Sequence, residues 1–190
     1  MYRKILTLGF AIIFALTLCS CGEKKTTELN ESNVKSVMAD FLPGASKAYH
    51  NILFGGYKAD DNLTDTKNYN DCDYAKVADS DFDTIDKVKA ETEKYFTKNY
   101  ADKNLYSKAF DSEYPIYKEF DGKLYVNIDG GGDGGYDYSA DSSTLKSADN
   151  SKYTVTVDCI DNYETAYTAT LEFVVEDGSI KIDNAVYNEK

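Results

Sequence analysis

The sequence predicts an α+β fold in which N-terminal helices pack on a curved antiparallel sheet. Two observations support this prediction. Apolar residues recur at helical spacing in the first half of the chain, and they recur at alternate positions, between short turns, in the second half. Helices first and an antiparallel meander afterwards make an α+β arrangement. Because such folds occur in enzymes, binding proteins and inhibitors alike, the fold class alone identifies no function.

The first twenty residues have the parts of a bacterial lipoprotein signal peptide. Two basic residues precede an apolar run that is too short for a comfortable membrane span. The run ends in LCSC, which resembles a lipobox because a branched residue stands three before the last cysteine and a small residue directly before it. We therefore predict residues 1–20 as the signal peptide and Cys21 as the lipidated N-terminus. An uncleaved anchor is the alternative, and either one places the domain outside the cytoplasm, on the membrane and facing the cell wall.

Charge narrows the range of partners. Removing residues 1–20 takes away two basic residues and no acid, so that 19 Lys and Arg face 33 Asp and Glu and the formal net charge changes from -12 to -14. Such a surface repels nucleic acid and favours a basic protein partner through long-range steering. Solubility alone is the other interpretation of the same charge.

The helical part is predicted to follow a polar tether. Residues 21–32 have no apolar period and are expected to link the lipid to a single α+β domain over residues 33–190. Asn30 or Ser32 can cap a first helix whose apolar face extends to about residue 54. Pro43-Gly44 is expected to break or restart this helix.

A long polar connection is predicted between the first helix and the second. Residues 57–81 are rich in Asp, Asn and Thr, and only a short strand or turn around 74–77 is expected there. Asp83 is expected to cap the second helix, whose apolar face extends to about residue 99. One further short helix is predicted over residues 105–110.

From residue 113 onward the chain is predicted to form a meander. Asp121-Gly122 and Asp177-Gly178 are turn dipeptides flanked by strand-like runs. Alternation gives the sheet one dry face, which the helices would cover, as in cystatin-like or NTF2-like folds. The inward residues of the clearest alternating strand are Tyr153, Val155, Val157 and Cys159.

A glycine-rich run interrupts the meander where one strand ends and the next begins. Five glycines in seven residues supply no side chain to bury, so the run is suited either to reaching main chain into another molecule or to a sharp bend between strands. It is a weak phosphate loop, because it leads into no helix and carries acids instead of a Lys or Arg. The run consists of Asp129, Gly130, Gly131, Gly132, Asp133, Gly134 and Gly135.

Catalytic and metal-binding patterns are not found in the sequence. His50 is the only histidine, and no nucleophile elbow or spaced zinc set is present. In the mature chain Cys72 and Cys159 form a candidate disulfide, since exported proteins permit one; alternatively, Cys159 is a small core residue. We therefore expect no enzymatic activity, no cofactor and no metal.

The order of elements resembles the IseA-type inhibitor family of cell-wall DL-endopeptidases. The resemblance is carried by DTIDKVKAETEKYFTKNYADK, YKEFDGKLYVNIDGGGDGG, NSKYTVTVDCI and LEFVVEDGSIKID, and it covers about residues 83–188. It implies an exported protein that binds the catalytic domain of NlpC/P60-type peptidoglycan hydrolases and blocks the active-site groove with a loop between strands. By position, the resemblance assigns the blocking role to Asp129–Gly135, with Tyr136 and Tyr138 as flanking anchors.

Two other functions are compatible with the sequence. One is a non-enzymatic binding lipoprotein that holds a small ligand or a glycan in the concavity of the sheet, lined by tyrosines. The other is an enzyme with buried carboxylates, but the one acid in an apolar run, Asp158, alternates onto the polar face. The sequence has no basic patch with interleaved aromatic residues, which is the pattern that indicates nucleic-acid binding.

The expected partners follow from the resemblance and from the predicted lipid anchor. They are a hydrolase catalytic domain and, through the lipid, the membrane. The protein itself is expected to be monomeric.

Overall fold

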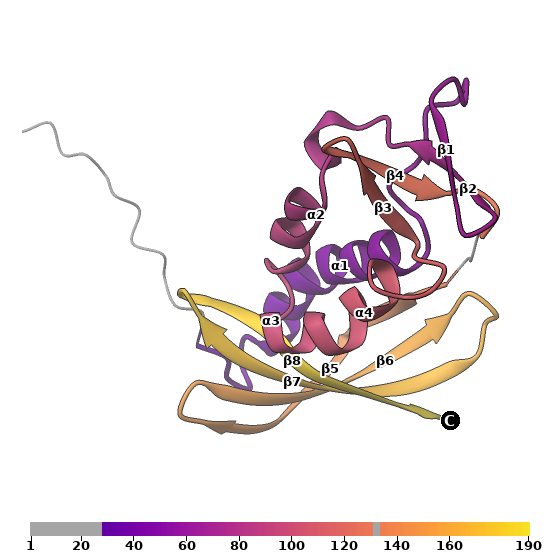
Figure 1. The fold of residues 1–190 in the computed structure, drawn as a ribbon. Coiled ribbons are helices and arrows are strands. Elements are labelled where there is room, and N and C mark those ends of the chain that lie inside the picture. The colour runs from indigo at the N-terminus through magenta and orange to yellow at the C-terminus, as the bar shows by residue number, and fades with distance from the viewer. Residues whose placement is uncertain (1–27, 131–133) are drawn as a thin grey trace, which may run out of the picture.

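A computed structural model of the protein describes residues 28–130 and 134–190, and it combines short helices with antiparallel strands (Figure 1). This arrangement confirms the predicted α+β class. The helices are α1 (Val34–Leu53), α2 (Ile85–Thr92), α3 (Lys98–Ala101) and α4 (Ser107–Ala109), with a 3-10 turn at Ser80–Phe82 and a π-helical turn at Asp102–Tyr106. The strands are β1 (Thr66–Tyr69), β2 (Cys72–Lys76), β3 (Tyr117–Phe120), β4 (Lys123–Asn127), β5 (Tyr136–Asp149), β6 (Lys152–Asp161), β7 (Ala166–Glu176) and β8 (Ser179–Glu189).

The strands form two sheets, whereas the sequence predicts one. The large sheet is a meander in the order β5-β6-β7-β8, and the small sheet has the order β1-β2-β4-β3. The predicted β3–β4 hairpin therefore pairs with β2 and not with the meander. β1 and β2 lie in the segment predicted to be mostly irregular, where only a short strand or turn around residues 74–77 was expected. β2 pairs with the distant β4, and β1 in turn pairs with β2, which local pattern does not report.

The core lies on the concave side of the large sheet, where α1 and the short helices cover it (Figure 1). Within α1, Met38 and Ile52 are both fully buried. The predicted alternation of β6 is confirmed, and Asp158 lies on the other, polar face. The inward residues of β6, all buried, are Tyr153, Val155, Val157 and Cys159.

α1 is continuous through Pro43 and Gly44, where the sequence predicts a break. Leu42 and Ala45, on either side, are buried in the core. A Cβ on Gly44 would lie 2.6 Å from Cζ of Tyr95, so the glycine admits a close contact between the helix and that ring. Burial of this face outweighs the cost of a proline inside a helix, about 3 kcal/mol.

The predicted tether extends less far than expected. Leu29 is buried and belongs to the core, and Asn30 Oδ1 accepts a hydrogen bond from the Ser32 N–H (3.0 Å) just before α1. The packed part of the chain therefore begins before residue 33. Among residues 28–130 and 134–190, no helix is long and apolar enough to cross a membrane. The predicted signal peptide and Cys21 lie outside the described residues.

The second predicted helix ends early because the chain after it joins the large sheet. The Ile182 N–H of β8 donates to the Tyr95 carbonyl (2.8 Å), and the Thr97 N–H donates to the Ile182 carbonyl (2.9 Å). The Thr97 hydroxyl also donates to Asp183 Oδ1 at 2.8 Å. Residues 95–97 therefore cover part of the outer edge of β8.

Thr84, and not Asp83, caps α2. The Thr84 side chain accepts a hydrogen bond from the Lys87 N–H, and Asp83 instead accepts from the ammonium groups of Lys87 and Lys123, both at 2.7 Å. These hydrogen bonds, the one from Lys123 first, lower the pKa of Asp83 from 3.8 to about 2. Asp83 thus links the start of α2 to β4.

We expect Asp83→Asn to lower the free energy of unfolding at pH 7 and to have little effect near pH 2. A carboxyl group with a depressed folded-state pKa stabilises the fold above its unfolded pKa, and this contribution disappears as the pH falls through the folded value. The difference between the two proteins should therefore shrink between roughly pH 4 and pH 2. Urea denaturation at several pH values measures it. Asp61→Asn, at an exposed carboxyl, serves as the control, and equal stabilities of Asp83→Asn and wild type at pH 7 would contradict the prediction.

Candidate functional site

The glycine-rich run connects the two sheets. β4, in the small sheet, ends at Asn127, and β5, in the large sheet, begins at Tyr136. The run is therefore a crossover and not a hairpin loop within one sheet. Gly131, Gly132 and Asp133 lie outside the described residues, so the site consists of the two ends of the run and the side chains that hold them.

Polar side chains of the small sheet hold the first end. Asn127 Oδ1 accepts hydrogen bonds from the N–H groups of Asp129 (2.9 Å) and Gly130 (3.0 Å). Asp129 Oδ2 accepts from the Asp73 N–H at 2.6 Å. Asn127 is buried, and its amide nitrogen donates to the Tyr74 hydroxyl at 3.4 Å. Asp129 and Gly130 are thereby fixed to β2 and β4 while remaining exposed.

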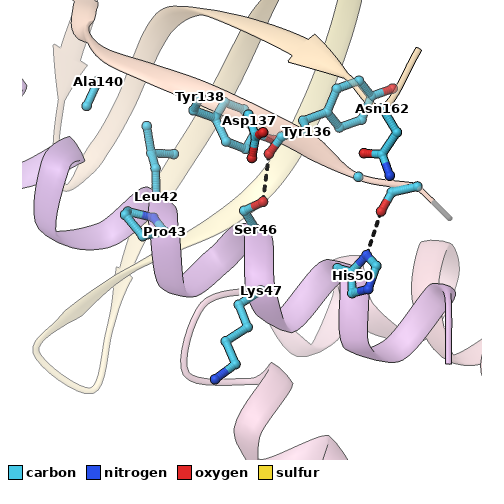
Figure 2. Close-up of a pocket in the computed structure, with 12 residues that line it drawn as sticks. Leu42, Pro43, Ser46, Lys47, His50, Tyr136, Asp137, Tyr138, Ala140 and Asn162 are labelled. Atoms are coloured by element: carbon cyan, nitrogen blue, oxygen red, sulfur yellow. Dashed lines mark hydrogen bonds between the residues drawn. The ribbon is translucent and has the colours of Figure 1, made fainter. Parts of the chain in front are cut away.

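Two side chains of α1 hold the second end. The Gly134 carbonyl lies 2.7 Å from His50 Nδ1, and since a carbonyl can only accept, Nδ1 carries the proton. The Ser46 hydroxyl donates to the Tyr136 carbonyl at 2.6 Å. Ser46 and His50 are one helical turn apart, and Figure 2 shows both pointing toward the start of β5. They form a clamp on the main chain.

Steric and conformational constraints explain why the second end of the run consists of glycines. A Cβ on Gly134 would lie 2.8 Å from Cδ1 of Phe54 and closer still to two other atoms of that ring. Gly135 has a φ of 135°, which other residues rarely adopt. The chain can therefore pass this close to the C-terminal end of α1 only where side chains are missing.

Tyr136 and Tyr138 pack inside their own molecule. The Tyr136 ring stacks on Tyr187, with ring centroids 4.0 Å apart, and it meets Tyr167 edge-on. The hydroxyl groups of Tyr138 and Tyr187 lie 2.7 Å apart, and burial raises the pKa of both. Both tyrosines thus anchor the run to the large sheet.

A cleft of about 560 Å³ lies beside the second end, between α1 and β5 (Figure 2). The sequence places a ligand pocket in the concavity of the sheet, but α1 and the core fill that concavity. Ser46 and His50 are four residues apart, so they lie on the same face of a helix. This spacing was the local signal that both side chains line one cleft. Its lining residues are Leu42, Pro43, Ser46, Lys47, His50, Gly134, Gly135, Tyr136, Asp137, Tyr138, Ala140 and Asn162.

The candidate disulfide is not formed, because Cys72 and Cys159 are both free. Cys72 lies in β2 of the small sheet, and Cys159 lies in β6 of the large sheet. Cys159 is a buried core residue, which is the alternative that the alternation of β6 indicates, and burial raises the pKa of its thiol to about 11. Within the part of the chain that the structure describes, no three His, Cys, Asp or Glu residues are grouped as metal ligands would be.

Comparison with known proteins gives no independent assignment. No protein-family model matches the chain, and a search of curated proteins finds no significant match. The resemblance to IseA-type inhibitors therefore stays a prediction.

Proposed function

We propose that this protein is an exported, lipid-anchored inhibitor of cell-wall DL-endopeptidases of the NlpC/P60 type. In this proposal the glycine-rich run, residues 129–135, occupies the active-site groove of the hydrolase. The observation that supports it most is the double anchoring of the run. The Asn127 side chain binds the main chain of the run at Asp129 and Gly130, and the His50 side chain binds it at Gly134 beside α1.

Fixed ends favour binding of a main-chain segment. A connection held at both ends has less conformational freedom to lose when it enters a groove, so more of the contact energy remains as affinity. Glycine also lets the main chain approach a catalytic Cys-His pair closely, because no side chain intervenes. Blocking substrate in this way requires no chemistry by the inhibitor.

The charge of the protein supports a basic target surface. The formal net charge is -12, and Asp129 is exposed at the first end of the run. Opposite charges at the rim of the groove would accelerate association and orient the encounter. Lipidation at Cys21 would hold the inhibitor near the wall, where its target acts.

The proposal is tested by adding the purified protein to an NlpC/P60 catalytic domain that digests isolated cell walls. We expect slower release of wall peptides, with binding about tenfold weaker at high than at low ionic strength, since exposed charges are screened by salt. A muramidase acting on the same walls is the control, because it cuts the glycan strand with carboxylates and has no Cys-His active site. Equal release with and without the protein would overturn the proposal.

The cleft beside α1 favours a second candidate function, the binding of a small ligand or glycan. Its volume of about 560 Å³ is within the range of ligand sites, and Ser46, His50 and Asp137 give it polar walls. A thermal-shift screen separates the two candidates. Stabilisation by a muropeptide or glycan, together with no binding to the hydrolase, would support this second function over the first.

A further inference from the structure

β5 is an edge strand, and the direction of its main-chain groups follows from one contact. Only β6 pairs with it within the described residues. The Tyr136 carbonyl accepts a hydrogen bond from Ser46 of α1, so Tyr136 directs its main-chain groups away from β6. In an antiparallel ladder this direction alternates, and Tyr138, two residues on, therefore also faces the edge beside α1.

The donors that α1 supplies to this edge end before Tyr138. His50 and Ser46 bind the carbonyls of Gly134 and Tyr136, because four residues of helix rise about 6 Å and two residues of strand span about 7 Å. The next position in this series on α1 is Leu42, whose side chain cannot donate. The N–H and C=O of Tyr138 make no hydrogen bond with the described part of the chain outside the β5–β6 ladder, from which they point away.

The cleft lies along this edge, beside α1. Tyr138 lines it, and apolar walls are formed there by Leu42, Pro43 and Ala140 (Figure 2). Asp137 also lines the cleft, is exposed, and takes part in no ion pair within residues 28–130 and 134–190. A sheet edge with unpaired main-chain groups is a template for an added strand.

We propose that an extended segment of a partner protein binds in this cleft by strand addition to β5 at Tyr138. The segment residue opposite Tyr138 would direct its side chain toward the apolar walls, so a small apolar residue fits there. Its neighbour in the segment would direct its side chain to the face of Asp137, where a Lys or Arg forms an ion pair. The edge at Tyr138 follows the glycine-rich run, whose Gly134 and Gly135 also line the cleft, and strand addition there does not depend on inhibition of a hydrolase.

A random heptapeptide library, panned on the purified protein, tests this surface. We expect enrichment of peptides that alternate small apolar residues with Lys or Arg. The peptide with the highest enrichment is then synthesised. It should bind the Asp137→Lys variant about tenfold more weakly than wild type, because the change replaces an electrostatic attraction by a repulsion. Asp141→Lys, an exposed acid on β5 that does not line the cleft, should bind within about threefold of wild type.

Amide hydrogen exchange locates the peptide independently. The Tyr138 amide should exchange at least about tenfold more slowly when the peptide is bound, because it gains a hydrogen-bond acceptor. No enriched peptide, equal binding to the two lysine variants, or protection elsewhere without protection of Tyr138 would each overturn the proposal. None of these results bears on the hydrolase assay, so the two proposals fail separately.

Discussion

Replacing Gly134 by alanine should weaken inhibition of the target hydrolase about 10- to 100-fold. At Gly134 the new Cβ would meet the Phe54 ring at 2.8 Å or less. Overpacking of this kind costs about 1–3 kcal/mol, and each 1.4 kcal/mol is a factor of ten in affinity. The strain would displace the second end of the run from the clamp on α1.

The double variant Gly134→Ala with Phe54→Ala distinguishes this mechanism from general damage. Removing the ring makes room for the methyl group, so the double variant should inhibit within about threefold of Phe54→Ala alone. Inhibition constants for wild type and the three variants, with circular dichroism to verify folding, supply the measurement. Undiminished inhibition by Gly134→Ala would mean that the position of this end is irrelevant to binding.

Tyr117→Phe should lower the free energy of unfolding by about 2–3 kcal/mol. The Tyr117 side chain is fully buried in β3, and its hydroxyl donates to the Asn51 carbonyl of α1 and accepts from the Tyr57 N–H at 3.2 Å. The Asn51 carbonyl retains the Gly56 N–H as a donor, but the Tyr57 N–H loses its partner inside the core. An unsatisfied buried group costs about 1–3 kcal/mol, to which the lost hydrogen bond is added.

Urea denaturation of Tyr117→Phe measures this effect, with Tyr163→Phe as the matched control. Tyr163 is 81% exposed, so removal of its hydroxyl should change stability by less than about 0.5 kcal/mol. An equal effect of the two changes would contradict the importance of the Tyr117 hydroxyl. The expected loss would also show that this buried contact between the small sheet and α1 contributes to the stability of the fold.

The parts of the fold that local sequence determines were predictable. The α+β class, the Asp-Gly hairpins and the alternation of β6 all follow from periods and turn residues within a few positions of one another. β1 was missed, and β2 was expected only as a short strand or turn around residues 74–77, because β2 is stabilised by pairing with the distant β4 and β1 by pairing with β2. The turn between them, Asn70-Asp71, has φ values of 50° and 61° and was a usable hairpin signal.

The site was predictable only in part. The composition of the glycine-rich run drew attention to it, but the anchors of its ends come from Asp73, Ser46 and His50, far away in the chain. A lone histidine on a helix gives no sign that its partner is a glycine carbonyl 84 positions later. The resemblance assigns Tyr136 and Tyr138 as flanking anchors by position, but no local pattern reports that the Tyr136 ring stacks on Tyr187.

The contact of residues 95–97 with β8 has a consequence for how copies of the protein behave together. An open sheet edge permits a second chain to continue the sheet, and repetition of that step builds fibres. At Ile182 both main-chain groups are bonded to the Tyr95–Thr97 segment, so an incoming strand finds neither a donor nor an acceptor at that point. A second copy therefore cannot continue the sheet along β8 through Ile182 unless the Tyr95–Thr97 segment first detaches.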